Sequence, residues 1–300
     1  MRAASRPAVR PAVASNRKYA VGVKVLVLID RSRSVVLSGR SGPRVLVTDV
    51  WYPAAAAADR PGAPLASADR PFPLIVFGHG FTQTPAPYAA LLRSWAAAGY
   101  VVAAPVFPLE NAAAPGGPDE TDLVHQPADV SFVITRLLGL SARRAGFWSQ
   151  SIDARRIAVA GHSDGGETAV ALVYDRAFLD PRIRAAVILS GARIPGTGQD
   201  QLVGASARDP RALLAVQGTA DPINPPSFTT DFFALAPRPK YLLTLIGAAH
   251  LGPYTDEQPQ LGIVERVSRA FLDAYLRMRP DAMSRLRAAG DVPGLASLSR

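Results

Sequence analysis

Residues 156–175 read RIAVAGHSDGGETAVALVYD, and they divide into a strand, a turn and a helix. The first part, RIAVA, is a short apolar run, as expected for a buried strand. The last part, residues 165–174, has the apolar spacing of a helix. The turn between them, GHSDG (161–165), matches the pattern G-x-S-x-G. Its glycines allow a strand and a helix to approach closely on either side of a serine on a sharp turn.

The alternation of strand and helix continues along the chain on both sides of this turn. Most of the later apolar runs are continuous rather than alternating, which is typical of parallel strands covered on both faces. The predicted strands are 19–29, 44–51, 73–77, 100–104, 156–160, 185–189, 213–217 and 241–246, and the predicted helices are 87–98, 127–140, 165–174, 227–235 and 260–278. Two adjacent strands followed by strand–helix repeats predict an α/β fold, with a mostly parallel eight-stranded sheet and helices on both faces.

The predicted domain organisation has one globular unit at residues 19–279. Residues 1–18 form a basic, proline-broken tail, and residues 280–300 are expected to be a short helix or tail. Only about twenty residues separate the strands at 185–189 and 213–217, which is too few for a separate folding unit. We therefore expect no large cap domain and an open cleft.

The basic charge of the chain lies at its N-terminus. Residues 1–44 hold ten Lys and Arg and one acid, which accounts for the whole net charge of +9, and the rest of the chain is balanced. A nucleic-acid partner is therefore not expected. No apolar run reaches the ~18 residues of a membrane span. No signal peptide is predicted, which favours a cytoplasmic protein, or a secreted one if a signal has been removed.

The absence of cysteine excludes a thiol nucleophile, and the turn at 161–165 offers a serine instead. A serine hydroxyl is a weak nucleophile unless a base takes its proton and an acid orients that base. Enzymes with this type of turn place nucleophile, acid and base in that order along the chain. We therefore interpret Ser163 as the nucleophile.

The base and the acid should follow Ser163 at the ends of later strands, where open parallel sheets form their sites. Among the four histidines only His250 follows Ser163, and it comes just after the apolar run YLLTLI. The favoured acid is Asp221, directly after the strand at 213–217. The rival acids are Asp200 and Asp209, in the preceding loop, and Asp231, in a predicted helix.

Two backbone N–H groups are candidates to stabilise a developing oxyanion. One belongs to Asp164, the residue after the nucleophile, and the other to Phe81, in the loop GHGF that follows the strand at 73–77. Phe81, His79 and His162 are also candidates for contact with a substrate. The histidines lack the spacing of metal ligands, so we expect neither a metal nor an organic cofactor.

Taken together, six segments of the chain resemble the α/β-hydrolase superfamily over residues 19–279. Within it, the chain is similar to dienelactone-hydrolase-like and platelet-activating-factor-acetylhydrolase-like esterases, with bacterial cutinases and polyester hydrolases as neighbours. The resemblance implies Ser163 as nucleophile, His250 as base and Asp221 as acid. The segments are DVWYP (49–53), PLIVFGHGF (73–81), QPADVSFVI (126–134), IDARRIAVAGHSDGGETA (152–169), QGTADPIN (217–224) and GAAH (247–250).

The chain departs from these families at two places. Dienelactone hydrolases resemble this architecture but use a cysteine nucleophile, which this chain lacks. The residue after the nucleophile is Asp164, where the polyester hydrolases usually have an apolar residue. A carboxylate there would oppose an oxyanion if it pointed inward, so we expect its side chain to point away.

The function expected from these residues is serine carboxylic-ester hydrolysis through an acyl-enzyme, by a monomer. An open cleft favours short-to-medium acyl esters and extends to polyesters, so the expected partner is a small-molecule or polymeric ester. Two alternatives stay open. One is another acyl transferase or a peptidase with the same three residues, and the other is a non-catalytic α/β-hydrolase that binds a ligand.

Overall fold

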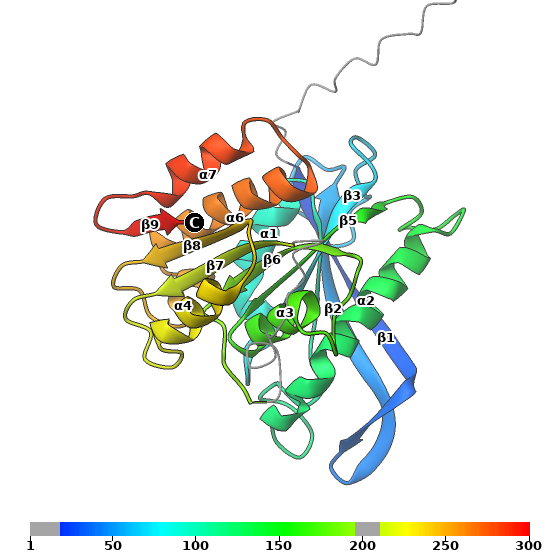
Figure 1. Cartoon of the computed structure of the whole chain (residues 1–300). Coiled ribbons are helices and arrows are strands. Elements are labelled where there is room, and N and C mark those ends of the chain that lie inside the picture. The colour runs from blue at the N-terminus through cyan, green and yellow to red at the C-terminus, as the bar shows by residue number, and fades with distance from the viewer. Residues whose placement is uncertain (1–18, 196–210) are drawn as a thin grey trace, which may run out of the picture.

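The computed structural model describes residues 19–195 and 211–300, which form one sheet with helices on both sides (Figure 1). The predicted tail 1–18 and most of the segment between β6 and β7 lie outside the described residues. No helix in the described ranges is both long and apolar enough to cross a membrane.

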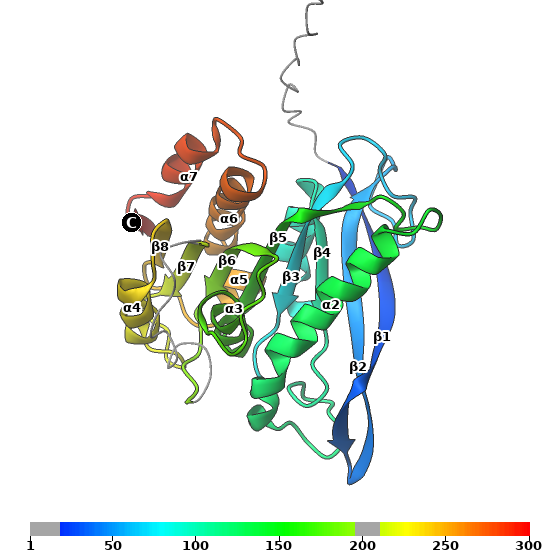
Figure 2. The same cartoon turned by 45° about the vertical axis from the view of Figure 1, so that its right-hand side comes forward.

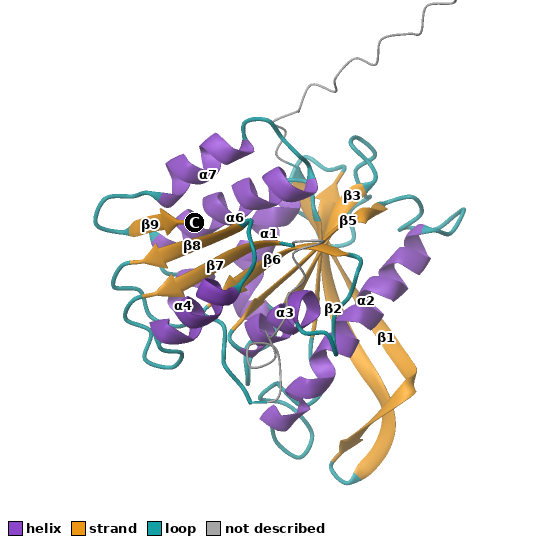
Figure 3. Cartoon of the chain, in the orientation of Figure 1, coloured by secondary structure: helices purple, strands orange, loops and turns teal. Residues whose placement is uncertain are grey.

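The described strands join in the order β1-β2-β4-β3-β5-β6-β7-β8-β9. Neighbouring strands from β4 to β8 are parallel, and β1, β2 and β9 are joined by antiparallel pairing. Figure 3 shows the strands as one twisted sheet between the helices. The strands are β1 (Ala20–Leu37), β2 (Arg40–Ala54), β3 (Phe72–Gly78), β4 (Val101–Pro105), β5 (Ile152–His162), β6 (Ile183–Leu189), β7 (Ala212–Gly218), β8 (Lys240–Leu245) and β9 (Ala296–Ser299).

The helices cover the two faces of this sheet in separate layers. Helices α1 and α6 pack on one face and α2 and α3 on the other, the latter two lying in front of the sheet in Figure 2. The helices are α1 (Ala89–Ala97), α2 (Gln126–Ser141), α3 (Asp164–Tyr174), α4 (Pro226–Leu235), α5 (Gly252–Thr255), α6 (Gln260–Leu276) and α7 (Ala282–Gly290), with the 3₁₀ turns η1 (Ala86–Tyr88) and η2 (Glu120–His125).

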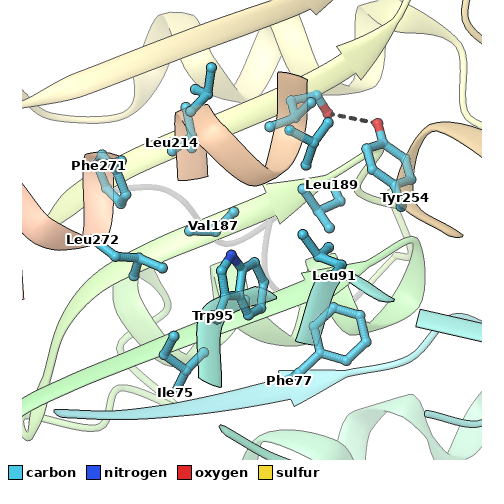
Figure 4. Packing of buried hydrophobic residues seen from close by; sticks show 14 of the residues in the cluster. Ile75, Phe77, Leu91, Trp95, Val187, Leu189, Leu214, Tyr254, Phe271 and Leu272 are labelled. Atoms are coloured by element: carbon cyan, nitrogen blue, oxygen red, sulfur yellow. Dashed lines mark hydrogen bonds between the residues drawn. The ribbon is translucent and has the colours of Figure 1, made fainter. Parts of the chain in front are cut away.

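The continuous apolar runs arise because each central strand contributes side chains to two cores, one on each face of the sheet. Along β3, Ile75 and Phe77 belong to the core under α1 and α6, whereas Leu74 and Val76 belong to the core under α2 and α3. Alternate side chains of a strand point to opposite faces, so both sets must be apolar when both faces are covered. Figure 4 shows the first core, in which Trp95 lies among side chains from the strands and from α6.

The predicted α/β fold class is confirmed, and the described residues add one strand to the eight expected. The added strand is β9, which pairs antiparallel with β8 inside the segment predicted as a helix or tail. Its four residues, ASLS, lack the apolar run that marks the central strands. Strand β1 also continues to Leu37, beyond the predicted end at residue 29, because it passes a bulge between Asp30 and Ser34.

A buried ion cluster ties the start of β2 to η2 and α2. The guanidinium of Arg44, 1 % exposed, donates to both oxygens of Asp122 at 2.8 Å and to both oxygens of Asp129 at 2.6 and 2.9 Å. Arg33 also pairs with Asp129, at 2.7 Å. Removing one member of such a cluster leaves a buried charge without its counter-ion, which is strongly destabilising.

We therefore expect Arg44→Ala to lower the free energy of unfolding by roughly 3–5 kcal/mol. Urea denaturation followed by circular dichroism measures the change. The matched control is Arg93→Ala, which breaks the exposed pair with Asp59 and should cost at most about 1 kcal/mol. Equal losses in the two variants would contradict a special role for the buried cluster.

Candidate active site

Ser163 sits between β5 and α3 in a backbone conformation that side chains rarely adopt. Its φ and ψ are 54° and −118°. Three hydrogen bonds hold this peptide in place: its N–H donates to Leu189 O at 3.0 Å, and its carbonyl accepts the N–H of Glu167 and of Ala192, each at 3.0 Å. Strain of this kind persists only where the surroundings enforce it, and it clusters at functional sites.

Glycines make the turn possible because three backbones meet there. A Cβ on Gly161 would lie 2.0 Å from the carbonyl oxygen of Gly165, and one on Gly165 would lie 2.1 Å from the carbonyl oxygen of Gly78. A Cβ on Gly80 would be 3.1 Å from Ser163 Cβ. The sequence therefore needs glycine at these points to bring β3, β5 and α3 together around Ser163.

Asp221 and His250, on the loops after β7 and β8, form a hydrogen-bonded pair. His250 Nδ1 lies 2.8 Å from Asp221 Oδ2, while Asp221 Oδ1 accepts the N–H groups of Ile223 and Asn224, each at 2.9 Å. Burial opposes ionisation of this carboxyl, but the hydrogen bonds from His250 and the two N–H groups lower the pKa of Asp221 to about 2. Asp221 is therefore a carboxylate at neutral pH, and His250 Nδ1 carries the proton of this bond.

The rival acids do not take this position in the described part of the chain. Asp231 is exposed on α4 and pairs with Arg193 at 3.6 Å. Asp200 and Asp209 lie outside the described residues.

Two side chains among the described residues form hydrogen bonds with the Ser163 hydroxyl. Its Oγ accepts from Asn224 Nδ2 at 3.3 Å and donates to Asp164 Oδ1 at 3.4 Å. No hydrogen bond joins Ser163 Oγ to the His250 ring among the described residues, although both line one cavity. Unliganded sites often have long contacts of this kind that shorten when substrate binds. The sequence prediction missed Asn224, whose only signal was its place in the TADPIN run that follows β7.

The cavity around Ser163 has a volume of about 550 Å³. Phe81 and Asp164 both line it, and no acceptor in the described ranges takes the backbone N–H of either residue. The apolar wall comes from Phe81, Ile194, Ile223, Phe228 and Leu251, and the polar lining includes Gln83, Glu120, Arg193 and His250. Within residues 19–195 and 211–300, no group of three or more acidic or histidine side chains is arranged to hold a metal ion.

The side chain of Asp164 does not point away as expected, because it reaches the Ser163 hydroxyl and lines the cavity. Close to it lies Glu110, which is fully buried and whose two carboxyl oxygens have no hydrogen-bond partner among the described residues. Burial, followed by the charge of Asp164, raises the pKa of Glu110 far above its usual range, and burial also raises the pKa of Asp164. A buried carboxyl group that has neither a donor nor a counter-ion favours its protonated, neutral form. Glu110 therefore keeps its proton at neutral pH.

The two histidines proposed for substrate contact are both buried, with both ring nitrogens engaged. His79 Nδ1 bonds to Gly80 O at 2.9 Å, and its Nε2 accepts the Phe107 N–H at 3.0 Å. His79 does not line the cavity, so its position corrects that expectation. His162 does line the cavity, at only 2 % exposure, and its ring bonds to Tyr88 and to the carbonyl of His250.

The raised pKa of Glu110 leads to a prediction about the pH dependence of stability. The unfolded chain releases the Glu110 proton near the ordinary pKa of 4.5, whereas the folded chain keeps it to higher pH. The contribution of Glu110 to the free energy of unfolding is therefore fully present below pH 4.5. It is lost progressively as the pH rises towards the raised pKa of the folded state. Glu110→Gln is close to the same size, is neutral at every pH and has no proton to release. We expect this variant to melt about 2–6 °C above the wild type at pH 8 and at the same temperature at pH 4.

Differential scanning fluorimetry across this pH range measures the effect. Asp231→Asn, which changes an exposed carboxyl on α4, is the matched control and should not separate from the wild type as pH rises. A Glu110→Gln variant that is less stable at pH 8 would show that Glu110 is ionised in the folded protein.

Comparisons with known proteins agree with this architecture. Residues 63–197, less than half of the chain, match the chlorophyllase family. Among solved structures, a ferulic acid esterase from Streptomyces cinnamoneus aligns with a TM-score of 0.66 and 23 % identity, covering 91 % of this chain and 93 % of that one. No curated protein sequence gives a significant match. Together with the sheet order and the strand–turn–helix around Ser163, these similarities show that the chain has the α/β-hydrolase fold.

Proposed function

We propose that this chain is a serine carboxylic-ester hydrolase with Ser163 as nucleophile, His250 as general base and Asp221 as the acid that orients it. The observation that carries the proposal is that three features meet in one cavity: a serine on a strained turn, a histidine paired with a carboxylate, and two backbone N–H groups that have no acceptor among the described residues. The esterase named above as a structural neighbour supports the same reaction class.

The proposed reaction is a two-step acyl transfer. His250 Nε2 takes the Ser163 proton while Oγ attacks the ester carbonyl, and the oxyanion is stabilised by the N–H groups of Phe81 and Asp164. The alcohol leaves with the proton from His250. Water then attacks the acyl-enzyme, gives its proton to His250 and releases the carboxylic acid, after which the proton returns to Ser163.

The cavity limits the substrates that fit this site. Its volume of about 550 Å³ lies within the roughly 300–1,000 Å³ of small-molecule sites. Phe81, Ile223 and Phe228 offer an apolar wall for an acyl group or for one unit of a polymer strand. We infer a preference for short-to-medium acyl esters, with polyesters as an extension of the same chemistry.

Hydrolysis of p-nitrophenyl esters from acetate to laurate tests the proposal. We expect the rate to be highest for the short and medium chains, and Ser163→Ala to reduce kcat by at least about 10⁴-fold because the acyl-enzyme cannot form. A folded wild-type protein without activity on any ester would reject the proposal. Activity on a matched anilide that exceeds activity on the ester would favour a peptidase instead.

The choice of acid has its own test. Asp221→Asn removes the charge that stabilises the histidine and its Nδ1–H form, so kcat should fall by roughly 10⁴-fold. Asp231→Asn, on the exposed face of α4, should leave kcat unchanged. Circular dichroism establishes that both variants are folded. A small effect at Asp221 would remove that residue from the proposed mechanism.

A further inference from the structure

His162 lies at the centre of an aromatic cluster next to the proposed base. Its ring centroid is 4.5 Å from that of His250, 5.2 Å from that of Tyr254 and 5.5 Å from that of Tyr88. These side chains come from the end of β5, the loop after β8, α5 and η1. A polar ring fully enclosed in this way needs partners for both of its nitrogens.

Both partners are present, and together they fix which nitrogen carries the proton. His162 Nε2 is 2.9 Å from the backbone carbonyl oxygen of His250, which can only accept, so Nε2 must carry the hydrogen. His162 Nδ1, 2.8 Å from Tyr88 Oη, must then accept from the tyrosine hydroxyl. That hydroxyl in turn accepts the Gly80 N–H at 3.5 Å.

This chain of hydrogen bonds connects two loops whose relative position the proposed mechanism requires to be fixed. One end is the main chain of His250, and the other is Gly80, the neighbour of Phe81. Asp221 already fixes the His250 ring through Nδ1, and the bond from His162 fixes the backbone that carries the ring. Burial, followed by the charge of His250, lowers the pKa of His162 to about 3. The ring therefore stays neutral beside a His250 that gains a proton during the reaction.

We propose that His162 is a positioning residue, which holds the main chain of His250 through its Nε2–H and links it through Tyr88 to the loop that carries the Phe81 N–H. The proposal rests on the hydrolase function inferred above. It assigns His162 a role in alignment, in place of the substrate contact that the sequence suggested.

Two amide variants separate this role from simple packing. The Nε2 amide of glutamine can reach the place of the histidine Nε2, whereas the shorter asparagine can reach only the place of Nδ1. We expect His162→Asn to lower kcat about tenfold with KM within twofold, because one hydrogen bond to the His250 carbonyl is lost. His162→Gln should stay within about threefold of the wild type. Equal kcat values in the two folded variants, or an effect on KM alone, would overturn the proposal.

Tyr88→Phe keeps the ring and removes the donor to Nδ1, so it tests the other end of the chain of bonds. We expect kcat to fall about threefold, since His162 then keeps its bond to the His250 carbonyl but loses its link to the loop that carries the Phe81 N–H. A kcat equal to that of the wild type would overturn the link through Tyr88. If both His162 variants fail to fold, Tyr88→Phe still tests the proposed positioning role, because it leaves His162 in place.

A measurement on the inactive Ser163→Ala protein is independent of activity. Nitrogen-15 spectra of the imidazole rings should show His162 as the Nε2–H form and His79 as the Nδ1–H form, with no titration of His162 between pH 5 and 8. His79 serves as the internal control, because its bonds require the opposite form. An Nδ1–H form at His162 would overturn this inference, whereas absence of esterase activity in the wild type would overturn the proposed function alone.

Discussion

The close approach of three backbones around Ser163 is the constraint on which the rest of the site depends. Gly78, Gly161 and Gly165 touch main chain to main chain, and a single methyl group at either of the last two would collide with a carbonyl at about 2 Å. This contact brings the end of β3 beside the end of β5, so the loop with Phe81 and the turn with Ser163 face one cavity. The parallel order of the strands then places Asp221 and His250 at the same edge of the sheet.

Much of this arrangement could be predicted from the sequence because its signals are local. Apolar runs such as YLLTLI indicate central strands, and GHSDG indicates its own turn through its glycines. The fold class follows from the order of these runs. Strand β9 carries no such signal, because an edge strand of only four residues needs no continuous apolar run. Its place is decided by pairing with β8, which is a property of the folded chain.

The polar groups around Ser163 could not be predicted from the sequence for a different reason. Asn224 and Glu110 meet Ser163 and Asp164 from loops that lie far away in the sequence, and nothing in PLEN or PIN indicates such a contact. The orientation of Asp164 depends on this same packing, so the expectation that it points away was wrong. His79 and His162 both lie in glycine-rich turns of similar appearance, yet only the folded structure shows that one lines the cavity and the other does not.

The acidic side of the cavity has a consequence for the end of the reaction. Glu120 lines the cavity, and Asp164, whose pKa burial raises to about 6, carries a negative charge at neutral pH. An uncharged ester meets no repulsion from these groups. In the proposed reaction, the carboxylic acid product ionises at neutral pH and then faces charges of its own sign. If the proposed reaction holds, these side chains admit an uncharged ester and disfavour rebinding of the product, so accumulation of the acid should inhibit hydrolysis only weakly.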